Sequence, residues 1–378
     1  MNTSVVLILD SRGIIINGGF DVITRHEAYA KALTNKSMLK LIVFTASQSI
    51  NKANQRYRNL GIEIISNPTF NSLKFAKASY KFIKDNNLDV KALVVGDPWA
   101  SLVTALWLNK FLGGEIAIQT QIHADIGDRR WRRLNLKNYF KYSLAKVFIK
   151  YADSIRVVSK AQANLITRSF SVDKSRLEVI PVPINNLSLL SKSPNKRPRT
   201  IGFFGRIHQD RGIWEFIELV KKLNSYKQDF NIIIAGDGND KEKFLKHLYN
   251  VIPKSRVSYL GQIPEIKLRK IWKKVGVLVS MAPVESYGRV MREALVAGVP
   301  VWACPSSGVK DLMDGCEKGT VKIINLNMCA SDLAKEFEVL LKTKVSSKFA
   351  KIFIKNNEIY AEMLAQSWIK TIHEAKKV

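Results

Sequence analysis

The 378-residue chain has few cysteines, few acidic residues and no long run of apolar residues. Its three cysteines, Cys304, Cys316 and Cys329, are odd in number and lack Cys-x-x-Cys spacing, which argues against a disulfide framework and a zinc site. No stretch of about 18 apolar residues is uninterrupted, so we expect no transmembrane helix. The first residues carry no basic segment before an apolar stretch, so we expect a cytoplasmic protein.

Acidic residues are outnumbered: 60 Lys and Arg stand against 32 Asp and Glu, which gives a net charge of +28. Residues 1–190 hold 27 basic and 13 acidic residues, so both halves of the chain are basic. Such a charge suits an anionic partner, either phospholipid headgroups or nucleic acid, with polyanionic substrates as a further option. Solvated lysine-rich faces are the alternative. Because no RNA-binding aromatic motif or helix-turn-helix pattern is visible, nucleic acid is the weaker option.

The apolar pattern predicts an α/β protein with two domains, and the composition, 46% hydrophobic and 24% charged, is that of a globular protein. Segments typical of strands alternate with helical segments from the N-terminus, and the alternation restarts at residue 200 after a linker-like stretch rich in Ser, Pro and basic residues. This order predicts parallel sheets with right-handed crossovers. The expected strands of the first half are 5–9, 41–45, 62–65, 92–95, 116–121 and 155–159.

We therefore expect an N-terminal Rossmann-like domain over residues 1–190, a C-terminal Rossmann-like domain over 199–345, and C-terminal helices over 346–378. The last segment has an apolar stripe but no strand to pair with. We expect it to pack across a surface already formed, for which the N-terminal domain is one option.

The segment 276–304 carries the chemistry that the pattern indicates most clearly. It reads as strand, loop, helix and strand, which places Glu285, Tyr287, Gly288 and Arg289 at the carboxyl edge of a sheet and Glu293 on the helix. Gly288 and a helix N-terminus suit a phosphate, and carboxylates accept hydrogen bonds from hydroxyl groups. A nucleotide sugar has both groups, so we assign Glu293 to a ribose and Glu285 to the transferred sugar. Two glutamates on a solvent-exposed helix are the alternative.

With two Rossmann-like halves, a linker and this Glu-x7-Glu segment, the chain resembles the retaining GT-B glycosyltransferases, family 4 in particular (glycosyl transferases group 1). The resemblance implies the same roles for Glu285 and Glu293. Phe204-Gly205-Arg206 and Arg211-Gly212 are similar to the family's Gly-Arg…Lys-Gly element, whose two cations hold the diphosphate, with Arg211 in place of Lys. Guanidinium pairs well with phosphate oxygens, so the change is tolerable.

The resemblance implies further donor contacts at turns that could also be ordinary strand exits. Asp237 lies in a glycine turn near the nucleotide base, Ile263 in a segment whose backbone meets the base, and Gly18 and Gly19 in a loop that approaches the donor phosphates. His123 falls where family members often carry a histidine near the reaction centre, and a histidine satisfied in a loop would look the same. Asp97 either contacts the acceptor or forms a turn. Two positions depart from the family pattern: Asn185 stands where the family has Asp after the first domain, and Ser306-Ser307-Gly308 stands where it has Gly-Gly.

The implied reaction transfers a sugar from a nucleotide diphospho-sugar to a hydroxyl of a glycan or lipid-linked acceptor, with retention of configuration. Glu285, His123 and Arg206 are its candidate catalytic residues. No metal is expected, because no Asp-x-Asp motif stands at a strand end, and no cofactor beyond the nucleotide-sugar substrate. The resemblance points to synthesis of cell-surface polysaccharide or glycolipid. A nucleotide-sugar epimerase of the same fold is the alternative.

Residues 129–150 hold eight basic residues and no acidic one. The segment opens with Arg129, Arg130, Arg132 and Arg133, which are candidate membrane or acceptor contacts. Behind them, apolar residues fall on one helical face flanked by lysines, which suits either an anionic membrane surface or core packing. The membrane option predicts a peripheral enzyme at the inner face of the cell membrane. The apolar residues of this face are Phe140, Leu144, Val147, Phe148 and Tyr151.

Overall fold

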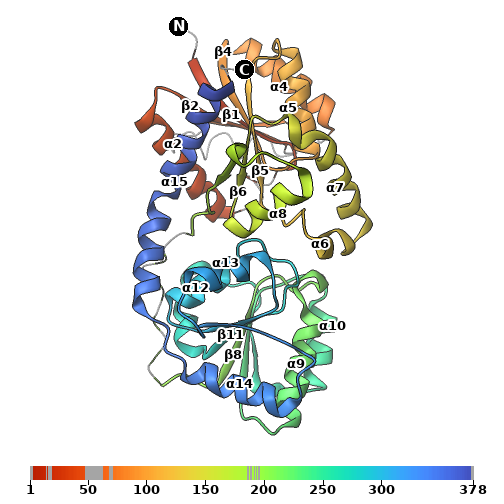
Figure 1. Ribbon diagram of the computed structural model, residues 1–378, viewed down its shortest axis with the longest axis vertical. Helices are drawn as coiled ribbons and strands as arrows, with labels where there is room; N and C mark the ends of the chain where they lie inside the picture. The colour runs from red at the N-terminus through yellow and green to blue at the C-terminus, as the bar shows by residue number, and fades with distance from the viewer. Residues whose placement is uncertain are drawn as a thin grey trace. The chain divides into compact units, whose positions relative to one another are not determined.

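The computed structural model describes residues 3–13, 15, 19–46, 63–67, 71–184, 187, 190, 192, 194 and 196–375. For residues 3, 19–21, 63–66 and 265–266 it describes the backbone alone. The chain forms two compact units, one of Met1–Asn185 with Glu358–Val378 and one of Asn186–Asn357. Each unit is built on a parallel sheet with flanking helices (Figure 1).

The N-terminal unit contains a seven-stranded sheet in the order β3-β2-β1-β4-β5-β6-β7. Helices α2 and α15 lie on one side of it and α4, α5 and α7 on the other (Figure 1). Because both faces are covered, β1 is apolar on both faces, with Val5, Val6 and Leu7 fully buried. The strands are β1 Thr3–Asp10, β2 Lys40–Ala46, β3 Glu63–Asn67, β4 Leu88–Val95, β5 Ala117–Ile122, β6 Ser154–Val157 and β7 Leu177–Val179. The helices are α2 Gly19–Lys36, α4 Ser72–Asp85, α5 Ala100–Phe111, α6 Arg129–Arg133, α7 Leu136–Phe148 and α8 Lys160–Phe170.

The C-terminal unit contains a six-stranded sheet in the order β10-β9-β8-β11-β12-β13. Its core joins α9, α10 and α14 to the sheet through Phe216, Phe244 and Phe337, all fully buried. The strands are β8 Thr200–Phe204, β9 Asn231–Ala235, β10 Val257–Tyr259, β11 Val277–Ser280, β12 Val301–Ala303 and β13 Val321–Ile323. The helices are α9 Ile213–Ser225, α10 Lys241–Tyr249, α11 Glu265–Ile271, α12 Arg289–Val296, α13 Ser307–Gly315 and α14 Ala330–Lys342.

The two parallel sheets confirm the fold class that the alternating pattern predicts. Two strands were not predicted, β7 and β13. Each has three residues and pairs with a neighbour on one side, at the end of its sheet. Three residues give little periodicity of their own; β12 is equally short and was predicted because the strand, loop and helix before it mark its place.

The last helix, α15 (Ser347–Ala375), begins in the C-terminal unit and ends in the N-terminal one. Trp368 is fully buried there and packs edge-on against Tyr29 of α2. Its indole N–H donates to Gln119 Oε1 of β5 at 2.9 Å, while Gln119 Nε2 donates to Ser367 Oγ at 2.8 Å and Ser154 Oγ at 3.0 Å. These buried polar contacts fix the register of α15 against the sheet.

Replacement of Gln119 by leucine should lower the free energy of unfolding of the N-terminal unit by about 2–3 kcal/mol, because the Trp368 N–H loses its acceptor in a buried site. Urea denaturation measures the change. Gln262→Leu, at an exposed position of the other unit, is the matched control and should shift stability by less than about 0.5 kcal/mol. Equal midpoints for Gln119→Leu and the parent would contradict the role of this network.

Candidate active site

The site predicted from the Glu-x7-Glu segment lies where three neighbouring strands end. β8, β11 and β12 are adjacent and parallel, so the loops that follow them meet at one edge of the sheet. The loop after β8 carries Arg206 and Arg211, the loop after β11 carries Glu285 and Gly288, and α13 begins after β12. This edge therefore gathers both predicted cations and one predicted carboxylate.

Gly212 lets the first two loops approach each other. Its φ is +68°, which L side chains rarely adopt, and a Cβ built on it would lie 2.1 Å from the Met281 carbonyl oxygen. The residue starts α9 and follows Arg211 directly. Because the contact leaves no room for a side chain, glycine at this position holds Arg211 against the loop that contains Glu285.

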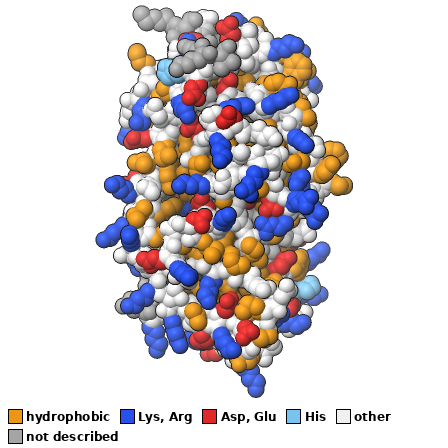
Figure 2. Space-filling view, viewed as in Figure 1, with side chains coloured by type: hydrophobic (Ala, Val, Ile, Leu, Met, Phe, Trp, Pro, Cys, Tyr) orange, Lys and Arg blue, Asp and Glu red, His pale blue; other side chains and the backbone are white. Residues whose placement is uncertain are grey.

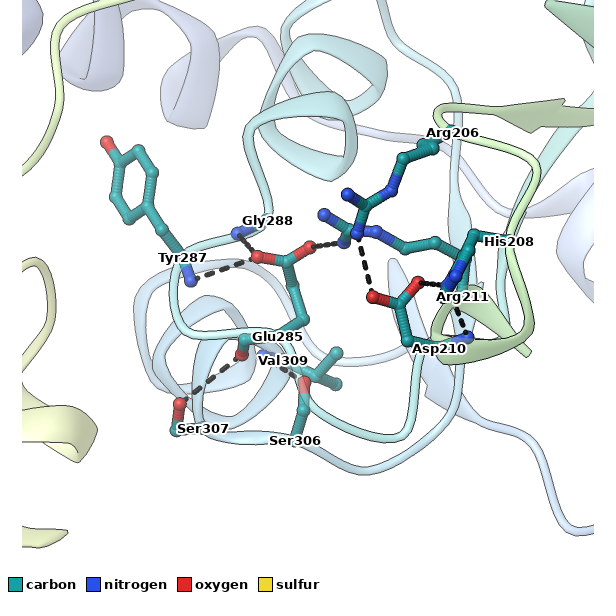
Figure 3. Close-up of polar contacts among 10 residues, drawn as sticks. All are labelled: Arg206, His208, Asp210, Arg211, Glu285, Tyr287, Gly288, Ser306, Ser307 and Val309. Atoms are coloured by element: carbon teal, nitrogen blue, oxygen red, sulfur yellow. Dashed lines mark hydrogen bonds and ion pairs between the residues drawn. The ribbon is translucent and has the colours of Figure 1, made fainter. Parts of the chain in front are cut away.

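Glu285 contacts both Arg211 and the N-terminus of α12 (Figure 3). Its Oε2 pairs with Arg211 Nη1 at 2.7 Å, and its Oε1 accepts a hydrogen bond from the Gly288 N–H at 3.2 Å. The side chain of Glu285 is 22% exposed and that of Arg211 39%. The carboxylate thus occupies the kind of position, between a guanidinium and a helix N-terminus, that also suits a phosphate.

Arg206 is paired in a similar way. Its Nη2 lies 2.7 Å from Asp210 Oδ2, and the guanidinium groups of Arg206 and Arg211 lie side by side between the carboxylates of Asp210 and Glu285 (Figure 3). The Arg206 side chain is 56% exposed, the largest exposure in this group. Sequence reasoning missed Asp210, although its place four residues after Arg206 is a spacing at which opposite charges often meet.

The start of α13 holds the backbone of Glu285. The Gly308 N–H donates to the Glu285 carbonyl oxygen at 2.7 Å, and Ser307 Oγ donates to the same oxygen at 3.3 Å. A Cβ on Gly308 would lie 2.7 Å from that oxygen, so glycine is needed there. The Ser306-Ser307-Gly308 segment therefore keeps a glycine where the contact requires one.

The remaining residues of the segment lie on or next to α12. Glu293 is half-buried in the helix, Arg289 is half-buried at its first position, and Tyr287 is buried with its ring turned away from the Glu285 carboxylate (Figure 3). Sequence reasoning missed Arg292. Its guanidinium carbon lies 3.8 Å from the centre of the Tyr287 ring, and its Nη2 pairs with Asp311 Oδ2 of α13 at 2.7 Å.

The turns after β9 and β10 form the next part of the same edge. Gly236 has a φ of +143°, and a Cβ there would lie 1.8 Å from the Gly205 carbonyl oxygen, so the turns after β8 and β9 are in close contact. Asp237 is exposed, accepts from the Gly238 N–H at 2.8 Å and lies 3.5 Å from Lys241 Nζ. Ile263 is half-buried beyond β10. Asp237 thus stands next to the loop that carries Arg206, since its carbonyl oxygen accepts from the Ile207 N–H at 2.9 Å, while Ile263 lies beyond β10, one strand further along the sheet.

The predicted residues of the N-terminal unit are less closely grouped. Gly18 and Asn185 lie outside the described residues, and Gly19 is the first residue of α2. Asp97 is buried and accepts from the Trp99 and Ser101 N–H groups at 3.1 Å each, which favours the turn over an acceptor contact. Arg129, Arg130, Arg132 and Arg133 form α6, where Asp128 pairs with Arg130 at 2.7 Å.

His123 directly follows β5 at the carboxyl edge of its sheet. Loss of surrounding water, and then the charges of Arg156, Arg25 and Arg12, lower the pKa of His123 to about 3. His123 is exposed by surface area, so the three cations are the firmer cause; the ordinary pKa of 6.5 is already below 7 and every one of these effects lowers it, so the ring is neutral at pH 7. A group with so low a pKa is a weak proton acceptor, which favours hydrogen bonding over proton abstraction as its contribution.

Within the described part of the chain, no group of three or more His, Cys, Asp or Glu side chains is arranged to hold a metal ion. No described helix is both long enough and apolar enough to cross a membrane.

Arg292→Met should lower the free energy of unfolding of the C-terminal unit by about 2–4 kcal/mol, because it leaves Asp311 and the Tyr287 ring without their cation in a site where the arginine side chain is 5% exposed. Denaturant unfolding measures the loss. Arg256→Met is the control, since the Arg256–Asp229 pair is exposed and should matter by less than about 1 kcal/mol. Combined with Asp311→Asn, the loss should be smaller than the sum of the single losses, and strict additivity would refute the coupling.

The C-terminal part of the chain is similar to a family of known proteins. Residues 190–359 match the family model described as glycosyl transferases group 1. The chain is 26% identical over 171 residues to the 2-deoxystreptamine glucosyltransferase of Streptomyces kanamyceticus, covering 45% of this chain and 43% of that protein. It is 28% identical over 138 residues to the GDP-mannose-dependent alpha-mannosyltransferase of Mycolicibacterium smegmatis, covering 36% and 34%. The matches thus span less than half the length of these two relatives.

Solved structures resemble the chain over nearly its whole length. HepE of Anabaena, in complex with UDP-glucose, superposes with a TM-score of 0.68 at 16% identity, covering 97% of this chain and 100% of HepE. Sucrose-phosphate synthase of Thermosynechococcus elongatus superposes with a TM-score of 0.69 at 16% identity, covering 100% and 98%. The two parallel sheets and these likenesses establish the GT-B fold, and residues 190–359 match the model of the glycosyl transferases group 1.

Proposed function

We propose that the protein is a retaining glycosyltransferase that moves a sugar from a nucleotide diphospho-sugar to a hydroxyl of a glycan or lipid-linked acceptor. The observation that carries the proposal is the convergence of Arg206, Arg211 and Glu285 beside the N-terminus of α12. Two guanidinium groups and a helix N-terminus suit a diphosphate, and the adjacent carboxylate suits sugar hydroxyls. The family match, the names of both curated relatives and the UDP-glucose bound by HepE support it.

Donor binding in this proposal exchanges ion-pair partners. The diphosphate takes Arg211 from Glu285 and Arg206 from Asp210, two pairs that are already formed in the chain. The diphosphate carries about the same charge as the two carboxylates together, and its oxygen atoms can pair with both guanidinium groups at once. Glu285, once released, accepts hydrogen bonds from the sugar, while Glu293 accepts from the ribose.

The reaction breaks the bond between the anomeric carbon and the phosphate oxygen and leaves the electron pair on that oxygen. The acceptor hydroxyl oxygen bonds to the same face of the anomeric carbon, and its proton passes to the departing phosphate. Arg206 and Arg211 stabilise the negative charge that grows there. Because the two guanidinium groups supply positive charge at this point, we propose that no bound metal or further cofactor is required. His123 is neutral, so it would act as a hydrogen-bonding partner.

For the acceptor and the cellular location, we propose a cytoplasmic enzyme that binds the inner face of the cell membrane and acts in synthesis of cell-surface polysaccharide or glycolipid. The net charge of +28 supports an anionic surface as partner. The eight basic residues of 129–150, with no acidic residue among them, support the same conclusion.

A thermal-shift screen of nucleotide sugars should find a donor that raises the melting temperature of the parent protein. Arg206→Ala and Glu293→Ala should each weaken binding of that donor about tenfold to a hundredfold, because each removes a charge-assisted hydrogen bond. Arg256→Ala, an exposed arginine of the same unit, is the control and should bind as the parent does. If no nucleotide sugar stabilises the parent protein, the proposal is wrong.

With the donor from this screen, a reaction assay distinguishes a glycosyltransferase from an epimerase. Free nucleoside diphosphate should appear when an acceptor is added and not in its absence, and EDTA should leave the rate unchanged. Conversion of the donor to an epimer without release of nucleoside diphosphate would favour the epimerase.

Glu285→Gln should affect diphosphate binding and turnover in opposite directions. Without the negative charge, Arg211 has no carboxylate partner in this loop, so nucleoside diphosphate alone should bind several-fold more tightly in calorimetry. Turnover should fall about a hundredfold or more, because an amide replaces the carboxylate that faces the sugar. Asp210→Asn releases Arg206 in the same way but should keep turnover. Weaker binding of nucleoside diphosphate by Glu285→Gln would contradict the exchange of partners.

A further inference from the structure

Helix α7 turns an apolar face toward solvent. At 3.6 residues per turn, five large apolar side chains fall within about 140° of arc. The buried residues of the helix, Asn138 and Ala145, fall on the opposite side. The five and their exposed fractions are Leu136 (79%), Phe140 (65%), Tyr139 (58%), Val147 (53%) and Leu144 (44%). The core-packing option for the predicted stripe is therefore wrong for Phe140, Leu144, Val147 and Tyr151, of which the last is 53% exposed just beyond the helix.

Specific contacts fix this orientation of the helix. Asn138 Nδ2 donates to the Trp131 carbonyl oxygen at 2.9 Å, and the N–H of Asn138 donates to Asn135 Oδ1 at 2.8 Å. On the same side, the Arg132 guanidinium lies 4.3 Å from the centre of the Tyr142 ring. A rotation that buried the apolar side chains would break these contacts, so the exposed face is a property of the folded unit.

Positive charge borders the apolar face on both sides. Lys137 and Lys146 are exposed and lie about 90° from the centre of the face, one on each border. Exposed Arg129 and Arg133 precede the helix, and exposed Lys150 follows it. In Figure 2, hydrophobic side chains protrude beside Lys and Arg side chains at the edge of the molecule where α7 lies.

We propose that this surface, the α7 face, binds a bilayer rich in anionic lipids. It consists of the five exposed apolar residues with Lys137 and Lys146. An amphipathic helix of this kind lies in the membrane plane, with apolar side chains among the upper acyl chains and lysines at the headgroup phosphates. The inference deepens the membrane part of the proposed function by naming the surface and the lipid charge it requires.

Charge selects the bilayer over a second copy of the chain. In a two-fold contact the same patch meets itself, which would bring Lys137 and Lys146 of both copies together. Residues 129–150 contain no acidic residue that could compensate. An anionic headgroup layer supplies the missing negative charge and the apolar environment at once.

Flotation of the full-length protein with vesicles tests the proposal. The protein should bind vesicles of phosphatidylcholine with 30% phosphatidylglycerol, and binding should fall at least about tenfold with phosphatidylcholine alone or in 0.5 M NaCl. Phe140→Ser with Val147→Ser, and separately Lys137→Gln with Lys146→Gln, should each reduce binding at least about tenfold. Equal binding by the parent and both double variants would overturn the proposal.

Matched controls use the same changes elsewhere. Met38→Ser removes a side chain that is 98% exposed in the N-terminal unit, and Lys221→Gln with Lys243→Gln removes two exposed charges in the C-terminal unit. Both controls should bind vesicles as the parent does. If the lysine control loses as much binding as Lys137→Gln with Lys146→Gln, overall charge rather than the α7 face is responsible, and the proposal is wrong.

Insertion distinguishes a lipid surface from other partners. The Phe140→Trp variant has one tryptophan more than the parent. The fluorescence that this tryptophan adds should be quenched by phospholipids brominated in the upper acyl chain. Absence of quenching, or a concentration-dependent dimer that Phe140→Ser with Val147→Ser dissociates, would overturn the proposal. These experiments contain no nucleotide sugar. Membrane binding by the α7 face can therefore be refuted while donor binding is confirmed, and donor binding can be refuted while membrane binding is confirmed.

Discussion

The Arg211–Glu285 ion pair is the interaction on which the arrangement of the site depends, because it joins the loops that follow two neighbouring strands. Both side chains are partly exposed, so the pair itself adds little to stability. Packing fixes the positions of the two loops: Gly212 leaves no space between its loop and Met281, and the Gly308 N–H of α13 donates to the Glu285 carbonyl oxygen. The backbone places the charges, and the ion pair then fixes the side chains.

The same edge keeps its charges balanced without a ligand. Arg206 and Arg211 lie side by side and would repel each other if they stood alone. Asp210 and Glu285 supply one carboxylate for each, so the four side chains carry no net charge. A site of this kind is preorganised for an anion because both guanidinium groups already point toward negatively charged oxygen atoms. Binding then requires an exchange of partners instead of a rearrangement of the backbone.

Sequence reasoning singled out Glu285 and Gly288 because they fall between a strand and a helix that the local pattern reveals, and Arg206 and Arg211 through the family resemblance. Asp210 and Arg292 escaped it, since their importance comes from the side chains they pair with and not from a pattern of their own. The amphipathic pattern of α7 was visible as well. The sequence did not show which side of that helix faces the core. The contacts of Asn138 and Ala145 decide the orientation, and the apolar residues themselves do not.

Helix α7 also has an inner side, and this side gives a physical reason for binding a membrane there. Lys141, unlike Lys137 and Lys146, is half-buried, and its Nζ lies 5.6 Å from the centre of the Trp99 ring, in the loop that follows β4. Burial lowers the pKa of Lys141. The carboxyl edge of the N-terminal sheet is thus separated from the α7 face by about one helix diameter, roughly 10 Å. A protein that rests on α7 would hold this edge near the headgroups. With the lipid-linked acceptor that we propose, the same contact would also bring the acceptor hydroxyl close to the site.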